Sequence, residues 1–419
     1  MRVINPTKID YTYITMSEQK TTQKRGLNLS PNIIFIGFIS LLTDVSSEMI
    51  FTLMPLFLVN VLGATTTIIG LIEGVAESTA SLLKIASGWL SDRLGNRKYL
   101  SFIGYALSAL SKPFMLIANA WGPVMAIRFA DRFGKGIRAA PRDALVGDSV
   151  DEDNRGKAYG FHKAMDTSGA AIGLALAALI VFLLQRDVVN LEFNTYHWMI
   201  IIGIVPAFIS LFFFIFIKEP PRKAVAACDV PPTLSAKEKA LDTKFKIFMV
   251  IIFLFTLGNS SDAFIVLRAQ DLGNSVLLIS LMLIMFNVVY ALFSMPAGIL
   301  SDKLGRRKVI IAGWIIYALV YLGLAVTNQG WMIWLLYAFY GLYYGLTQGV
   351  YRALVCDLVP EDRRGTAFGM YNGITGITLL PASLIAGWLW QSFSPAAPFY
   401  FGAALAGLSA IGLLVFVRE

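Results

Sequence analysis

The fold is decided by the sequence GWLSDRLGNRK at residues 88–98, because a second copy, GILSDKLGRRK, stands at residues 298–308. Each copy follows a long apolar run and ends in basic side chains. Asp302 follows Asp92 by 210 residues, half of the 419-residue chain. A recurrence at this spacing indicates a duplicated unit that fills each half of the chain.

Two further segments recur in the same order, which supports the duplication. The sequence ALVGD recurs as ALVCD, and SSE recurs as SSD, at residues 144–148 and 353–357 and at residues 46–48 and 260–262. The polar residues 218–243 separate the two halves. Parallel repeats joined by a polar linker are an architecture of membrane transporters.

Both halves are too apolar for a soluble protein. The chain is 56% hydrophobic and 15% charged, whereas soluble chains carry about 25% charged residues. A membrane-spanning helix needs about 20 mostly apolar residues. Lipid admits only helices or closed barrels, because every backbone polar group must be paired, and the alternation of barrel strands is missing. We therefore predict an all-α membrane protein with twelve transmembrane helices in two pseudo-symmetric six-helix bundles. The predicted helices are residues 32–61, 67–90, 99–119, 121–141, 157–184, 196–217, 245–267, 275–299, 308–327, 330–355, 365–390 and 396–416.

The basic residues predict how the chain lies in the membrane. Lys and Arg gather in the N-terminal tail, in the middle loop and in the loops after the second and eighth helices, whereas residues 63–67 and 328–330 have none. Cytoplasmic loops carry such an excess. Both termini are therefore expected in the cytoplasm, and the net charge of +8 needs no nucleic-acid partner. The expected parts of this inner-membrane protein are a cytoplasmic tail at 1–31, in which Met16 reads like a natural start, helical bundles at 32–217 and 245–417, and a cytoplasmic central loop at 218–244.

The repeated loop carries a family resemblance. The pattern G-x-x-x-D-R-x-G-x-R-K after the second helix, repeated after the eighth, resembles the signature loop of the major facilitator superfamily. The resemblance covers about residues 32–417. It implies a secondary transporter that alternates between inward-open and outward-open states around a central cavity, often with proton coupling.

Two departures from the family's proton antiporters leave the direction of transport open. Arg128 stands two residues farther from Gly134-x-Gly136 than in the antiporter pattern R-x-x-Q-G-x-G. Gly169-x-x-x-Gly173 is followed by Leu174, where the antiporter pattern has Pro. The run at residues 134–145 looks like a subgroup of bacterial members with poorly defined substrates.

Carboxylates within the predicted spans are candidates for proton coupling, because ionisable groups in a bilayer are costly and mark function. Two pairs with a spacing of four share a helical face, and a fifth carboxylate follows His162 by four residues. These candidates are Asp44, Glu48, Glu73, Glu77 and Asp166. The alternative is that these carboxylates only neutralise the basic fourth span. Likewise, His162 could form an ion pair or a proton relay with Asp166, or it could be a structural residue.

The substrate-binding candidates combine basic and aromatic side chains. Guanidinium groups pair bidentately with carboxylate or phosphate, so Arg128 and Arg132 could hold an anionic substrate; alternatively they form an ion-pair lattice with Asp131, Glu73 and Glu77. Tyr337, Tyr340 and Tyr344 share a face that lines a cavity or only packs. Two of the few charges in the second half complete the set: the candidates are Arg128, Arg132, Asp262, Arg268, Tyr340 and Tyr344.

Both signature loops are expected to act as gates. The resemblance implies that each loop aspartate stabilises one conformation, by pairing with nearby arginines and with a helix N-terminus across the bundle. The alternative is that the loops only orient the chain. The gating candidates are Asp92, Arg93, Arg97, Asp302, Arg306, Arg307 and Arg142.

These features favour a proton-coupled secondary transporter of a small polar organic molecule, anionic or zwitterionic, with export favoured. Uptake, for instance of an organic acid or a metal–siderophore complex, is the alternative; another is a non-transporting sensor or biogenesis factor on the same fold. A pump is not expected, because the phosphate-binding loop G-x-x-x-x-G-K-[ST] is absent. The two His and the two Cys, Cys228 and Cys356, are not spaced as metal ligands are. We therefore expect free thiols and no bound metal or cofactor, and we do not expect the protein to be an enzyme. The expected partners are substrate, protons and the lipid bilayer, and the chain is expected to be a monomer.

Overall fold

The computed structural model describes residues 30–94, 96–150, 155–186, 188–219, 243–359 and 364–416, and this part of the chain contains helices and turns but no strand. The helices are α1 (Pro31–Phe51), α2 (Met54–Asn60), α3 (Thr66–Leu94), α4 (Arg97–Ser111), α5 (Trp121–Asp148), α6 (Arg155–Leu184), α7 (Phe193–Phe212), α8 (Thr243–Gly258), α9 (Ala263–Asp271), α10 (Val276–Leu304), α11 (Arg306–Val326), α12 (Gly330–Asp357), α13 (Arg364–Ser392) and α14 (Ala397–Phe416), with the short 3-10 helices η1 (Lys112–Ile117) and η3 (Phe213–Phe216).

Twelve long segments result when consecutive elements are joined. Within the described residues, α1 continues into α2, α4 into η1, α7 into η3 and α8 into α9. Nine of these segments are long and apolar enough to cross a membrane. The other three, α3, α5 and α12, have 29, 28 and 28 residues but a more polar sequence. Polar side chains on a membrane helix face the protein interior or a water-filled cavity.

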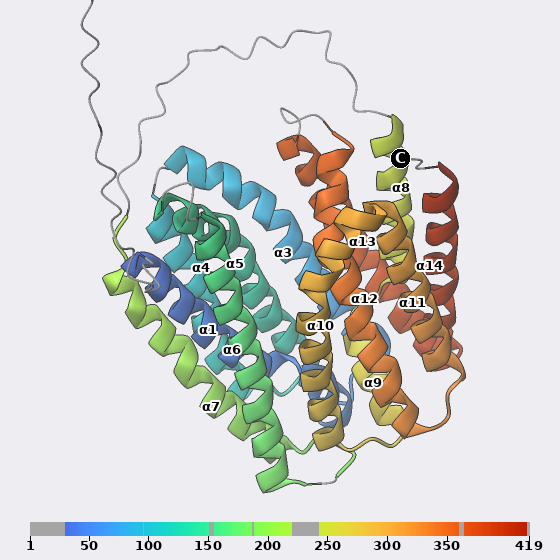
Figure 1. The fold of residues 1–419 in the computed structure, drawn as a ribbon. Coiled ribbons are helices and arrows are strands. Elements are labelled where there is room, and N and C mark those ends of the chain that lie inside the picture. The colour runs from blue at the N-terminus through green and yellow to red at the C-terminus, as the bar shows by residue number, and fades with distance from the viewer. Residues whose placement is uncertain are drawn as a thin grey trace, which may run out of the picture.

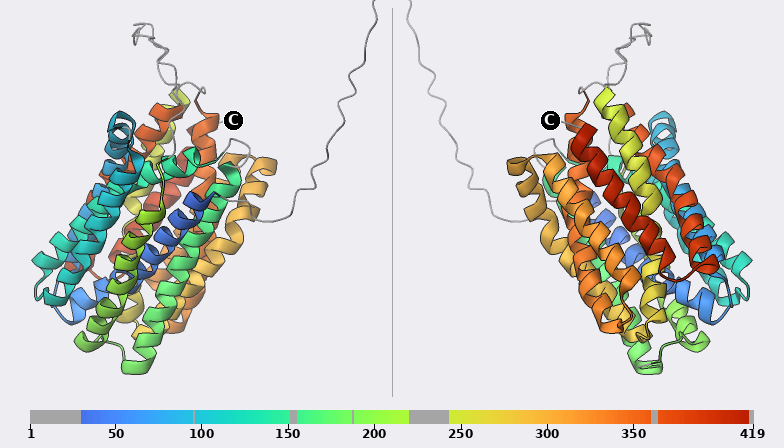
Figure 2. Two further views of the ribbon diagram at one scale, coloured as in Figure 1. Left: turned by 90° about the vertical axis from the view of Figure 1, so that its left-hand side faces the viewer. Right: turned by 90° about the vertical axis from the view of Figure 1, so that its right-hand side faces the viewer.

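The helices form two groups that pack against each other. The helices before residue 219 lie on the left of Figure 1 and those after residue 243 on the right. Figure 2 shows from two sides that the long helices run between the same two ends of the molecule. The main contacts between the groups are made by α3 with α13 and by α6 with α10. Most of the expected tail and most of the expected central loop lie outside the described residues.

Two helices that were predicted to be continuous are broken in the middle. The predicted helix 32–61 breaks between α1 and α2, just before Pro55, because proline lacks the backbone N–H and restricts the residue before it. The predicted helix 245–267 breaks between Gly258 and Ala263. Of the repeated segments, SSD (260–262) lies in the second break, whereas SSE (46–48) lies within α1, one turn before the first break. Discontinuous helices in transporters form binding sites in the middle of the bilayer.

Several helices run farther than predicted. α5 continues through Pro141 to Asp148, and α10 continues to Leu304. The prediction ended each helix where the apolar run ends, whereas a helix with polar residues can continue beyond the lipid.

The two ends of the molecule differ in how the groups meet. We call the end that holds Arg97, Lys98, Arg306 and Arg307 the basic end; it is uppermost in Figure 1. The other end is the sealed end, where the two groups are hydrogen-bonded across their interface. The donors and acceptors there are Thr66 Oγ1 to Gly387 O (3.2 Å), Val276 N to Val188 O (3.1 Å) and Gln270 Nε2 to Val189 O (2.8 Å).

The basic end is open. All of residues 291–296 on α10 are exposed, whereas Val276 and Ile279 near the sealed end are fully buried. A methyl group added at Gly349 or Gly369 would meet no atom within 4 Å, but one added at Gly74 of α3 would lie 3.0 Å from Leu380 Cα of α13. The molecule therefore has one accessible end and one closed end.

Candidate functional site

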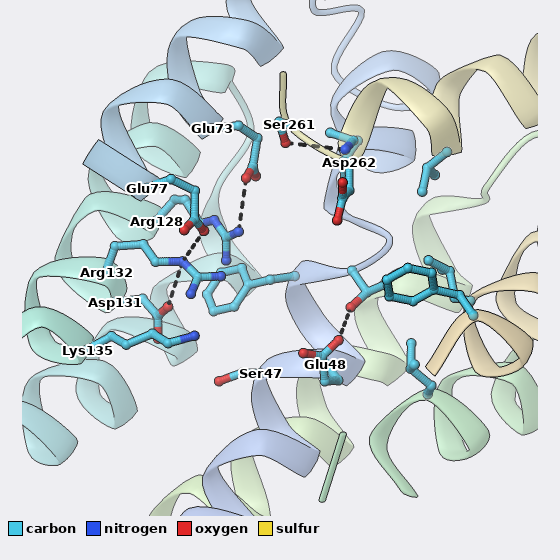
Figure 3. A pocket seen from close by; sticks show the side chains of 18 of the residues that line it. Ser47, Glu48, Glu73, Glu77, Arg128, Asp131, Arg132, Lys135, Ser261 and Asp262 are labelled. Atoms are coloured by element: carbon cyan, nitrogen blue, oxygen red, sulfur yellow. Dashed lines mark hydrogen bonds and ion pairs between the residues drawn. The ribbon is translucent and has the colours of Figure 1, made fainter. Parts of the chain in front are cut away.

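A cavity of about 410 Å³ lies between the two groups of helices. Its wall is built from the broken helices and from the polar helices α3, α5 and α12, together with α10 (Figure 3). The two helix breaks and the polar side chains of α3 and α5 therefore bring many charged groups together at one site. The charged lining residues are Asp44, Glu48, Glu73, Glu77, Arg128, Asp131, Arg132, Lys135, Arg138 and Asp262.

Ion pairs balance the two arginines that were predicted to bind substrate. Arg128 Nη2 lies 3.1 Å from Glu73 Oε2. Arg132 Nε lies 3.4 Å from Glu77 Oε1 and 3.9 Å from Asp131 Oδ2. These are the contacts that the ion-pair alternative requires, and they join α3 to α5 within the first half.

Other basic groups near the cavity have polar or aromatic partners. Lys112 is fully buried, and its Nζ donates to Ser46 Oγ (2.8 Å) and Ser47 Oγ (3.1 Å). The Arg138 guanidinium lies 4.4 Å from the centre of the Tyr105 ring. Among the described residues, no carboxylate lies within 4.0 Å of the basic nitrogens of Lys135 or Arg138. The α5 wall therefore keeps a positively charged portion in the cavity.

The proton candidates Asp44 and Glu48 have different partners. Asp44 lies beside Asp166 of α6, close enough for the two carboxyl groups to share a proton, whereas Glu48 Oε2 accepts a hydrogen bond from Thr52 Oγ1 (2.6 Å). Asp166 in turn accepts from Ser40 Oγ (2.5 Å) and lies 3.6 Å from Lys163 Nζ. From the spacing of four residues we expected Asp166 to pair with His162. In the structure, Asp166 instead contacts α1 and Lys163. The Asp44–Asp166 pair connects the cavity to the basic end, where Lys163 is 67% exposed.

The wall from the second half is acidic and aromatic. Asp262, in the break between α8 and α9, accepts hydrogen bonds from Tyr340 Oη (2.5 Å) and Tyr344 Oη (3.4 Å). Tyr344 lines the cavity, whereas Tyr340 is fully buried behind it. The sequence missed Phe286, whose ring lies 5.3 Å from that of Tyr344, because a phenylalanine in an apolar run gives no signal.

Arg268 is not at this site. Its Nε donates to Leu324 O (3.1 Å), its Nη2 donates to Thr327 O (2.9 Å), and its Nη1 pairs with Asp271 at 2.5 Å. It therefore satisfies carbonyl groups at the end of α11, which a helix leaves free. The expectation that Arg268 contacts substrate does not fit this position.

The signature loops bind the helix ends of their own half. Arg97 pairs with Asp148 at the end of α5, and Arg306 pairs with Asp357 at the end of α12 (3.2 Å). Lys98 Nζ donates to Ile217 O (2.5 Å), and Arg307 Nε donates to Leu413 O (3.0 Å). The ion pairs Arg97–Asp148 and Arg306–Asp357 are 209 residues apart and not 210, because α11 begins one residue earlier in its loop than α4 does.

Among the described residues, Asp302 of the second loop does not make the contact across the bundle that the resemblance implied. Asp302 is 62% exposed and pairs with Arg306. Arg93 lies over the Trp89 ring at 5.3 Å, and Arg142 binds Asp143 (2.9 Å) and Ser40 (3.4 Å). The side chain of Asp92 lies outside the described residues. Because the basic end is open, a gate there would be disengaged in this conformation.

Metal-ligand chemistry has no site in the described part of the chain. No group of three or more His, Cys, Asp or Glu side chains there could hold a metal ion. Cys356 is a free, half-buried thiol, and Cys228 lies outside the described residues.

Comparison with known proteins identifies the kind of protein to which the chain is similar. The profile of the Major Facilitator Superfamily matches residues 36–266 and 247–419. An uncharacterized MFS-type transporter of Methanocaldococcus jannaschii is 36% identical over 95% of this chain and 98% of its own length. The proton-coupled antiporter flippase LtaA of Staphylococcus saprophyticus is 22% identical over 79% of this chain and 80% of its own. A mutant of the nucleoside transporter NupG has the same fold, with a TM-score of 0.78, 14% identity and coverage of 92% of this chain and all of that one.

Proposed function

Because the chain belongs to the major facilitator superfamily, we propose that it is a proton-coupled secondary transporter that moves a small, polar, charged organic molecule across the cytoplasmic membrane by alternating access. The observation that carries the proposal is the charged cavity between the two halves, lined from both of them at the two helix breaks. In alternating access, each conformation opens the central site to one side of the membrane and closes it to the other. One open end and one closed end around the cavity fit such a conformation.

The positive charge at the basic end supports the orientation. Basic loops remain in the cytoplasm, so the basic end faces the cytoplasm and both termini lie there. The conformation is then inward-facing, and the sealed end is the outer gate. In the opposite state the contacts of Thr66 with Gly387 and of Gln270 with Val189 must open.

The carboxyl pair Asp44–Asp166 is the proposed proton carrier. Two carboxylates this close repel each other unless they share a proton. Asp44 faces the cavity, and Asp166 lies toward the basic end. A proton that enters the cavity while the outer gate is open can therefore leave from this pair toward the cytoplasm after the gate has closed.

The cavity wall supports a zwitterionic substrate. Arg128 and Arg132 are already paired, whereas Lys135 and Arg138 can meet an anionic group. Export is the proposed direction, and the antiporter named among the relatives supports it. Leu174, in place of the antiporters' proline, favours uptake as the second candidate. If the protein is instead a non-transporting sensor or biogenesis factor, it should carry no compound across the membrane.

The test is transport by the purified protein in proteoliposomes. Vesicles with an imposed pH gradient are incubated with a polar extract of the cells that express the protein, and their contents are compared with those of empty vesicles by mass spectrometry. We expect at least one compound to accumulate only with the gradient; the gradient polarity that drives accumulation reports symport or antiport.

Variants assign the proton step in this assay. Asp44→Asn should abolish gradient-driven accumulation but keep exchange of labelled for unlabelled compound, which needs no net proton movement. Glu192→Gln, which removes an exposed carboxylate outside the cavity lining, is the control and should keep both. If no compound enters any wild-type vesicle, the protein is not a transporter. Unchanged accumulation by Asp44→Asn would move the proton site to another carboxylate.

A further inference from the structure

We propose that Asp262 and the aromatic side chains around it form the binding site for a positively charged group of the substrate, such as an ammonium. This inference rests on the proposed function and names the substrate class. Asp262 was among the sequence-based candidates, but only an anionic group was assigned to particular side chains, the arginines of α5; the inference here assigns a positively charged group to Asp262.

The charge around Asp262 is the first argument. No basic nitrogen of the described residues lies within 4.0 Å of its carboxylate, which accepts hydrogen bonds only from neutral tyrosine hydroxyls there. By contrast, Glu73, Glu77 and Asp131 are paired with arginines on the opposite wall (Figure 3). A carboxylate in the membrane needs a counter-charge, and at Asp262 the cavity is the direction from which one can come.

The aromatic wall is the second argument. Cations bind over the faces of aromatic rings within about 6 Å, and quaternary ammonium groups are recognised in this way. Phe286, Tyr337 and Tyr344 line the cavity beside Asp262. The centre of the Phe286 ring lies 5.1 Å from the centre of the Tyr337 ring and 5.3 Å from that of the Tyr344 ring. The three rings therefore form one continuous surface.

The repeat supplies the third argument. Asp262 and Glu48 end the equivalent segments SSD and SSE, and both carboxylates line the cavity, one from each half. Glu48 also has a hydroxyl partner, Thr52, and no basic group within 4.0 Å among the described residues. The excess of carboxylates over basic groups in the lining, six against four, then fits a ligand that brings positive charge.

The test uses two probes of one shape and different charge. Choline carries a trimethylammonium group, and 3,3-dimethylbutan-1-ol carries an uncharged tert-butyl group in its place. Melting temperatures of the purified protein in nanodiscs are measured at pH 8 with each probe at equal millimolar concentration. We expect choline to raise the wild-type melting temperature by about 2 °C more than the alcohol does.

Variants locate the effect. Asp262→Asn keeps an acceptor for Tyr340 but removes the charge, so the difference between the probes should vanish. If Asp262→Asn does not fold, Asp262→Ser takes its place. Glu192→Gln, which loses an exposed charge outside the cavity lining, should keep the difference.

Two results overturn the proposal: equal shifts with both probes in the wild type, or a choline preference that survives in the Asp262 variant. Because this assay reads binding alone, its failure leaves transport standing. A failure of transport together with a choline preference would instead discard the proposed function and keep the site.

Discussion

At the scale of single residues, the cavity is organised by which charges have partners. Arg128 and Glu73 are both about 95% buried and pair at 3.1 Å. Arg128 also lies 4.6 Å from the centre of the Phe51 ring. A buried ion pair of this kind connects α5 to α3 but leaves little charge for a ligand.

The pair predicts a particular pattern of stability. Glu73→Gln leaves Arg128 without its counter-charge, and breaking a buried pair costs about 3–5 kcal/mol. The melting temperature should therefore fall in this variant and recover in the double variant Glu73→Gln/Arg128→Gln, which removes both charges. If Glu73→Gln melts as the wild type does, the pair is not a structural contact.

The sequence offered the ion pairs of Arg128 and Arg132 with Glu73, Glu77 and Asp131 as an alternative, but it did not predict that Asp44 lies beside Asp166. A spacing of four placed Asp44 with Glu48 and Glu73 with Glu77 on one helical face. The pairs observed instead connect different helices, Asp44 with Asp166 and Glu73 with Arg128. Contacts between helices depend on their packing, which a local spacing does not contain. Buried groups such as Lys112, which binds two serines of α1, were missed as partners for the same reason.

At the scale of helices, close packing sets where the carboxylates of α1 stand. Gly173 of α6 faces α1, and a methyl group added there would lie 2.6 Å from Val45 O and 3.0 Å from Glu48 Cβ. Small residues of this kind let membrane helices approach closely. The G-x-x-x-G pair in the sequence thus marks a packing surface beside the proton candidates.

Two alanine substitutions in α6 test this packing. Gly173→Ala should lower the stability by about 1–3 kcal/mol, because the methyl group forces α1 and α6 apart. Gly160→Ala in the same helix meets no atom within 4 Å and should be neutral or slightly stabilising, since alanine favours the helix. The melting temperatures of the two variants decide, and equal values would show that α1 and α6 are not in close contact.

The lengths of the apolar runs predicted the number of long helical segments, but not their breaks. A run of apolar residues indicates a membrane helix wherever it is about 20 residues long. The break after Gly258 is made by Asn259, Ser260 and Ser261, which are few enough not to interrupt the run. The segments with these breaks nevertheless carry Glu48 and Asp262, which line the cavity. The helix breaks, which the sequence did not predict, therefore help to build the cavity.

At the scale of the molecule, the two halves meet at the sealed end and separate at the basic end. The repeat predicted two similar halves, but not which end is closed, because both states share one sequence. The central claim is that the sealed end is a gate that must open in each transport cycle.

A reversible cross-link across the sealed end tests that claim most directly. Thr66 Oγ1 of α3 lies 3.3 Å from Gln391 Oε1 of α13. In a protein with Cys228 and Cys356 replaced by serine, Thr66→Cys and Gln391→Cys are joined by a short bis-methanethiosulfonate, and proteoliposome transport is measured before and after reduction. We predict that the cross-link abolishes transport, that reduction restores it, and that either single cysteine variant is unaffected by the reagent. Transport at the wild-type rate through the cross-linked protein would contradict the account.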